Sequence, residues 1–225
     1  MPPPASPPGP PAGRPAAGRP AAGGGRWVEV APERLARWLS GFAERHGATT
    51  ETTAPERVVV TAADGARAEL DVPFPPLSGD LVGHALRPRR VGVLLVRLGG
   101  HACGVFDGDD LVASKVGTRP VHGRSAAGGQ SQQRFARRRE GQARVALQAA
   151  ADTAARVLVP VAGTLEAVVT GGERTAVATV LEDPRLAVLP PLVTGRLLDV
   201  PDPRQAVLLQ APALYRAVRI RVVDP

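Results

Sequence analysis

The residues best suited to chemistry lie between His122 and Arg139, in the segment HGRSAAGGQSQQRFARRR. Gly128 and Gly129 carry no side chain and tolerate positive φ, so the backbone at this point can enter a narrow space. Gln130 follows them with a single amide, which both donates and accepts hydrogen bonds. The pattern predicts a flexible tip that ends in one polar group.

A long helix is predicted from about Ser131 to Val157, and it has two different faces. The apolar face, which should pack on a sheet, contains Phe135, Ala146, Ala150 and Val157. The basic face contains Arg134, Arg137, Arg138 and Arg144. An arginine-rich helix behind a polar tip suits an RNA-lined cavity, although a Gly-Gly-Gln triplet or a basic helix face alone is a weak signal.

The full set of residues in this segment closely resembles the catalytic loop of the eukaryotic and archaeal class I peptide-chain release factors. The matching parts are His122-Gly123-Arg124, Gly128-Gly129-Gln130-Ser131 and Arg134-Phe135-Ala136-Arg137, followed by Arg139. This chain differs by the inserted Ser125-Ala126-Ala127. Asp183-Pro184-Arg185-Leu186 is more similar to a relative of that domain, the ankyrin-repeat zinc-finger peptidyl-tRNA hydrolase of ribosome quality control. The resemblance covers about residues 85–225 and identifies an actinobacterial-type release-factor-like peptidyl-tRNA hydrolase.

This resemblance implies an RNase-H-like domain with a protruding GGQ loop that enters the peptidyl-transferase centre and hydrolyses the peptidyl-tRNA ester. The implied catalytic residues are Gln130, Gly129 and Gly128. The residues expected to contact ribosomal or transfer RNA are His122, Arg124, Ser131, Arg134, Arg137, Arg138 and Arg139. The expected partners are the large ribosomal subunit and peptidyl-tRNA, with no DNA, no membrane and no cofactor, and the protein is expected to be a cytoplasmic monomer.

Two alternatives share this partner: an endonuclease that cuts tRNA near its 3′ CCA end, and a non-catalytic ribosome-binding rescue factor. Codon independence is expected because only about fifty residues, Trp27–Leu77, separate the N-terminal tail from the resembling region. That length is too small for a codon-reading arm plus a factor-binding domain, and no domain is expected after the last strand. The expected role is therefore rescue of stalled or split ribosomes.

Other candidate sites give weaker signals. Asp107, Asp109 and Asp110 could suggest a metal cluster, but we interpret them as turn residues because the strand Val91–Leu98 has no carboxylate. Cys103 lies in an apolar strand and is interpreted as a core residue. The four histidines lack metal-ligand spacing, so no metal site is predicted.

Composition agrees with a polyanionic partner. The 225 residues contain 28 Lys and Arg against 21 Asp and Glu, which gives a net charge of +7, and the only lysine is Lys115. Guanidinium groups suit phosphate because they form planar bidentate contacts. The single cysteine excludes an internal disulfide framework, and no apolar run is long enough to span a membrane.

The predicted fold class is α/β (α+β) with three parts. Residues 1–25 form a disordered Pro/Ala/Gly-rich tail. Residues 26–80 form a small α+β segment, with a strand from Trp27, a helix over Ala31–His46 and the strands Arg57–Ala62 and Ala66–Val72. Residues 81–225 form the release-factor-like catalytic domain, and 117–129 are expected to be a mobile loop.

The catalytic domain is predicted to contain one mixed sheet with helices on its faces. The expected strands are Val91–Leu98, His101–Phe106, Leu111–Val116, Thr164–Thr170, Val193–Val200 and Ala217–Val223. The expected helices after the long one are Ala176–Leu181 and Arg204–Leu209.

Overall fold

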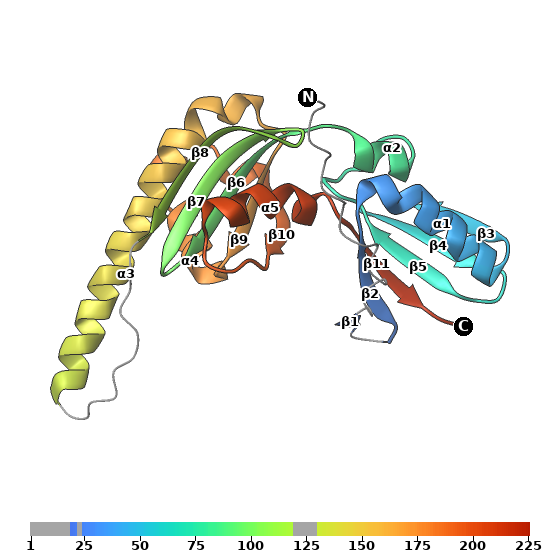
Figure 1. The fold of residues 1–225 in the computed structure, drawn as a ribbon, viewed down its shortest axis with the longest axis horizontal. Coiled ribbons are helices and arrows are strands. Elements are labelled where there is room, and N and C mark those ends of the chain that lie inside the picture. The colour runs from blue at the N-terminus through green and yellow to red at the C-terminus, as the bar shows by residue number, and fades with distance from the viewer. Residues whose placement is uncertain (1–18, 22–23, 119–129) are drawn as a thin grey trace, which may run out of the picture. The chain divides into compact units, whose positions relative to one another are not determined.

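A computed structural model describes residues 19–21, 24–118 and 130–225, with side chains for 20–21, 24–118 and 140–225. The chain divides into two compact units (Figure 1). Unit 1 contains the residues up to Val72 together with Val218–Pro225, and unit 2 contains Pro73–Ala217.

Unit 1 is built on one antiparallel sheet with the strand order β1-β2-β11-β5-β4-β3. Its elements are β1 (Arg19–Pro20), β2 (Arg26–Val30), α1 (Pro32–His46), β3 (Thr49–Thr53), β4 (Arg57–Ala62), β5 (Arg67–Asp71) and β11 (Val218–Val223). Strands β4, β5 and β11 alternate buried and more exposed residues, the pattern of a sheet with one covered face. Helix α1 covers that face with Leu35 and Phe42, both fully buried (Figure 1).

Three features of unit 1 differ from the sequence-based predictions. Order was expected to begin near Trp27, but β1 already pairs with β2. Strand β3 was not predicted, because all five of its residues are exposed and give no apolar alternation. The last strand was assigned to the catalytic domain, but it pairs with β2 and β5 in the sheet of unit 1.

Unit 2 is built on a five-stranded sheet with the order β10-β9-β6-β7-β8. Its strands are β6 (Arg90–Arg97), β7 (Gly100–Asp107), β8 (Asp110–Thr118), β9 (Ala167–Gly172) and β10 (Val193–Leu198). Its α-helices are α2 (Leu81–Leu86), α3 (Gln130–Val157), α4 (Arg174–Leu181) and α5 (Gln205–Tyr215). Strands β6, β7 and β8 form an antiparallel meander, whereas β9 lies parallel to β6 and β10 parallel to β9. This topology confirms the prediction of a mixed sheet with flanking helices.

Strand β6 has core on both sides, which explains its continuous apolar run. Leu94 and Val96 belong to the core that includes residues of α3 and α4. Val93 and Leu95 belong to the core that includes residues of α5. The mixed sheet is therefore buried between two helical layers, as expected for strands that alternate with helices.

Candidate functional site

The predicted catalytic segment lies at the junction between β8 and α3. Gly128, Gly129, His122 and Arg124 lie outside the described residues, because the description of the backbone stops at Thr118 and resumes at Gln130. Gln130 is the first residue of α3. The side chains of residues 130–139, which include Ser131 and four of the predicted RNA-binding arginines, also lie outside the described set.

The N-terminal end of helix α3 lies far from the core. It contains 28 residues, and Ala146 is its first buried residue among those whose side chains are described. At 1.5 Å per residue, Gln130 therefore lies about 24 Å along the helix axis from Ala146. The N-terminal part of α3 projects beyond the sheet, while its C-terminal part lies against it (Figure 1). This geometry suits a long probe with a fixed base.

Small side chains hold the base of α3 close to the sheet. Ala150 and Ala154 are completely buried and Ala151 nearly so, in the same core as Cys103 of β7. Cys103 is thus a core residue, as predicted, and burial raises the pKa of its thiol well above the ordinary value. Alanine lets the helix backbone approach the strands closely, so the packing fixes the position of the helix axis.

A buried hydrogen bond adds a directional link between α3 and β7. The Thr153 hydroxyl donates to the Ala149 carbonyl oxygen at 2.9 Å and accepts from His101 Nε2 at 2.9 Å. His101 is paired in the sheet with Gly117, one residue before the last described residue of β8. A Cβ atom at Gly117 would lie 2.5 Å from His101 Nε2, so the close approach of ring and strand requires glycine.

An ion-pair cluster connects α3 to the 3₁₀-helix Pro184–Leu186. Arg185 donates to both carboxylate oxygens of Asp183, at 2.9 and 2.8 Å, and to Asp152 of α3 at 2.7 Å. Hydrogen bonds from Arg185 lower the pKa of both carboxyl groups below the ordinary value. We call Asp152, Asp183 and Arg185 the α3 clamp. The Asp-Pro-Arg-Leu segment singled out in the sequence therefore has a structural role in positioning the helix.

The other carboxylates do not gather into a metal site within the described part of the chain. Asp107 and Asp110 pair across the β7–β8 turn, where Gly108 has a φ of 59°. Asp109 forms an ion pair with Arg216. These contacts agree with the interpretation of the three aspartates as turn residues.

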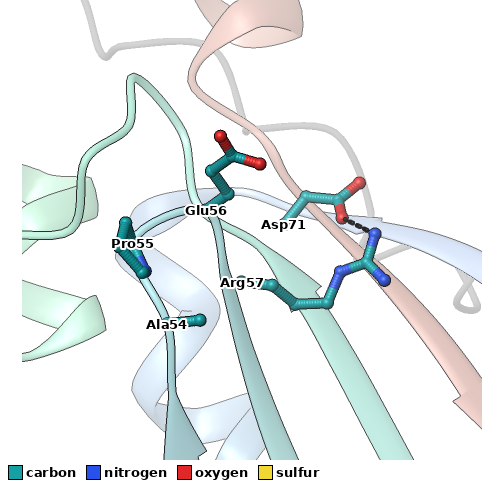
Figure 2. A pocket seen from close by; sticks show the side chains of 5 residues that line it. All are labelled: Ala54, Pro55, Glu56, Arg57 and Asp71. Atoms are coloured by element: carbon teal, nitrogen blue, oxygen red, sulfur yellow. Dashed lines mark hydrogen bonds and ion pairs between the residues drawn. The ribbon is translucent and has the colours of Figure 1, made fainter.

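A hollow lies in unit 1 at the β3–β4 turn, lined by Ala54, Pro55, Glu56, Arg57 and Asp71. Figure 2 shows the Arg57 guanidinium bonded to Asp71 on the neighbouring strand, at 3.2 Å. Both side chains are substantially exposed and satisfy each other. The hollow is an open surface feature in which Arg57 and Asp71 are already paired. No helix among the described residues is long and apolar enough to cross a membrane.

The family model described as Actinobacteria/chloroflexi VLRF1 release factor matches residues 89–221. This range includes the whole mixed sheet, α3, the α3 clamp and the GGQ segment. No curated protein matches the chain.

Two solved structures are similar in part. The crystal structure of an archaeal translation termination factor, aRF1, is 15% identical with a TM-score of 0.40, covering 84% of this chain and 66% of that one. A structure described as an archaeal protein is 19% identical with a TM-score of 0.40, covering 82% of this chain and 57% of that one. The chain thus spans somewhat less than two thirds of the length of these two proteins.

Proposed function

The chain belongs to the Actinobacteria/chloroflexi VLRF1 release factor family, and we propose that it releases nascent peptides from peptidyl-tRNA on stalled or split ribosomes. The bond broken is the ester between peptide and tRNA, and release does not depend on the codon. The observation that carries this proposal is the family match over residues 89–221, a range that includes Gly128-Gly129-Gln130. In this proposal, release is the work of unit 2.

In the proposed mechanism the tip residues organise water rather than act as acid or base. The Gln130 side-chain amide orders a water molecule against the ester carbon, and backbone N–H groups face the developing oxyanion. Gly128 and Gly129 let the backbone approach the ester closely. Water attacks the carbonyl, the ester C–O bond breaks, and the tRNA 3′ oxygen leaves with a proton.

The arginines behind the tip have a different role in this proposal. The helical backbone places three arginines on one side of α3, because Arg137 and Arg138 follow Arg134 by three and four residues. Contacts between guanidinium groups and RNA phosphates orient the protein but do not select the bond that is cut. These contacts stabilise the complex with the large subunit and hold the GGQ tip in position.

The test is peptide release from stalled ribosome–nascent-chain complexes by wild type, Gln130→Ala and the control Gln133→Ala. We expect Gln130→Ala to lower the release rate by roughly 10²–10³, as for the loss of one transition-state hydrogen-bond partner. Gln133→Ala, a change to another glutamine of α3, should retain nearly full release. Equal rates for wild type and Gln130→Ala would refute the catalytic role of this amide.

Two further measurements separate the alternatives. Sequencing the 3′ end of the released tRNA distinguishes ester hydrolysis, which leaves CCA intact, from endonuclease cleavage, which removes it. Release from complexes with a stop codon, a sense codon or no codon, and from large subunits alone, tests codon independence. A strong preference for stop codons would contradict the rescue role.

A further inference from the structure

A small pocket in unit 2 combines positive charge with unsatisfied buried polar atoms. Its volume is about 140 Å³, and it lies among Phe74, Arg89, Asp109, Tyr215 and Arg216 and their neighbours. Pockets that bind drug-sized ligands measure roughly 300–1,000 Å³. The pocket is therefore too small for a whole nucleotide and fits one small group.

Arg89 is a buried cation without a carboxylate partner. Only 6% of the residue is exposed, and no described carboxylate lies within ion-pairing distance of it. Its Nη1 donates to the Arg87 carbonyl oxygen at 3.1 Å and its Nη2 to the His84 carbonyl oxygen at 2.9 Å, while Nε has no partner. The guanidinium carbon lies 5.0 Å from the centre of the Phe74 ring. An unneutralised buried charge is costly, so this arrangement favours an anion.

His84 does not relieve this charge. Its Nδ1 accepts from the Ser78 backbone N–H at 3.1 Å, so its Nε2 carries the proton and donates to the Pro73 carbonyl oxygen at 2.7 Å. The 3.1 Å approach of Arg89 Nη2 to His84 Nε2 therefore joins two donors. Arg89 keeps N–H groups available for a further acceptor.

The other charged groups of the pocket balance one another, so its net positive charge comes from Arg89. Arg87 and Arg216 line it with Arg89, and each of these two forms an ion pair, with Glu166 and Asp109 respectively. Burial lowers the pKa of Arg89, and the positive charges of Arg87 and Arg216 lower it further. Because two of the three cations are balanced, an incoming anion meets one uncompensated charge at Arg89.

Tyr215 supplies a second unsatisfied group. It is 6% exposed, and its hydroxyl is buried without a hydrogen-bond partner. Burial raises the pKa of this phenol, with the Asp109 charge adding to the effect, so the hydroxyl stays protonated and can donate. Its ring packs edge-on against Phe74 and Phe106, which fixes its orientation.

We propose that this pocket binds one phosphate group through the Arg89 guanidinium and the Tyr215 hydroxyl, with Arg87 and Arg216 at its edge. The group is either free phosphate or a phosphate of an RNA backbone, since both present the same charged oxygens. A phosphate fits better than a neutral ligand because it neutralises Arg89 and accepts from several donors at once. This site is independent of the release activity of the GGQ segment.

The test uses the full chain with ring-¹³C-labelled tyrosine, because Tyr215 is the only tyrosine and gives one set of NMR signals. Inorganic phosphate, a short RNA without a terminal phosphate, and chloride at matched ionic strength are titrated separately. We expect saturable shifts of the Tyr215 signals with phosphate or with RNA, and none with chloride. Saturation by phosphate alone identifies free phosphate, and saturation by RNA alone identifies a backbone phosphate.

Three variants make the result specific, with binding measured by isothermal titration calorimetry. Tyr215→Phe should weaken binding about tenfold or more, the loss expected for one hydrogen bond to a charged acceptor. The same variant should unfold at the same temperature as wild type or higher without phosphate, because it removes an unsatisfied buried hydroxyl. Arg89→Lys keeps the charge but loses the planar fork, and should weaken binding similarly. Arg174→Gln, at an exposed arginine outside the pocket, should bind like wild type.

Two outcomes would overturn the proposal. One is the absence of saturable binding by either phosphate or RNA. The other is binding that Tyr215→Phe leaves unchanged, which would place the anion elsewhere on this basic chain. Neither outcome would affect the release assay with Gln130→Ala.

Discussion

Replacing Gly117 with alanine tests how the base of the predicted loop is held. Gly117 is the second-to-last residue of β8 and faces His101 of β7. The new Cβ would lie 2.5 Å from His101 Nε2, whereas non-bonded heavy atoms approach to about 3.5–4.0 Å. His101 must therefore move by about 1 Å, although only 5% of it is exposed.

The expected cost has two parts. Forcing an extra methyl group into a packed site costs roughly 1–3 kcal/mol. Moving the ring also weakens its bond to the Thr153 hydroxyl, which is worth about 1 kcal/mol. The sum is about 2–4 kcal/mol, which corresponds to a fall in Tm of roughly 4–16 °C for a domain of this size.

Urea denaturation followed by circular dichroism measures the free energy of unfolding, with Gly195→Ala as the control. Gly195 also lies in a strand, but a Cβ there meets no atom within 4 Å. Gly195→Ala should therefore leave the midpoint nearly unchanged. If Gly117→Ala matched this control, the tight fit between β8 and His101 would not exist in solution.

A double-mutant cycle identifies the mechanism. Thr153→Val removes the acceptor of the His101 ring and should destabilise wild type by about 1–3 kcal/mol, because a buried donor loses a partner. In the Gly117→Ala background the bond is already weakened, so the same change should cost less. Simple additivity of the two free energies would show that Gly117 and Thr153 act independently.

Three further predictions concern other parts of unit 2. A triple variant with Gln at Arg134, Arg137 and Arg138 should bind the ribosome more weakly. The slope of log K against log[salt] should become shallower by about 2, as expected for three lost phosphate contacts. An unchanged slope in filter-binding assays would show that these arginines form an ordinary solvated surface. Arg185→Gln should lower the unfolding midpoint. Because the pKa values of Asp152 and Asp183 are lowered in the folded state, the stability difference from wild type should be complete above their ordinary pKa of 3.8 and should shrink as the pH falls below it. A stability difference that stays constant down to pH 2 would contradict the α3 clamp. The Cys103 thiol should react with a thiol reagent only as fast as the protein opens, since it is fully buried; fast labelling in native buffer would show that the β7 core is accessible.

The meander of unit 2 and the start of α3 were predictable because their local signals agree with one another, whereas helix α2 was not predicted and α5 extends to Tyr215, beyond the predicted end at Leu209. The continuous apolar run at β6 and the Gly-containing turns that follow it define the meander to within about two residues. The start of α3 was predicted within one residue of Gln130. Each of these signals is local, so no knowledge of the partner strand was needed.

The partner of the last strand could not be predicted in the same way. Strand β11 pairs with β2, nearly two hundred residues earlier in the chain, and no local pattern specifies such a long-range contact. One signal was present, however. Arg219 and Arg221 alternate with buried apolar residues, as in β5, whereas the central strands of unit 2 are buried almost throughout. That alternation indicates a sheet covered on one face only.

The candidate site was predicted from its motif, but the contacts that position helix α3 were not. The sequence places Gln130 behind two glycines, yet it gives no sign that His101 and Thr153 would meet or that Arg185 would bind Asp152. These contacts join residues that are 52 and 33 positions apart. Polar residues with such separations carry no periodic pattern, so only the folded structure identifies them.

The length of α3 explains why this support matters for the proposed chemistry. A misplacement of about 1 Å at a reacting atom can cost 10²-fold in rate. Over an arm of about 24 Å, a tilt of only about 2–3° at the base produces that displacement at Gln130. Three sets of contacts hold the base of α3 at different residues: the buried Ala150, Ala151 and Ala154, the His101–Thr153 hydrogen bond, and the α3 clamp. Substitutions at the base of the helix should therefore slow release more than they weaken ribosome binding, although none of these residues reaches the ester.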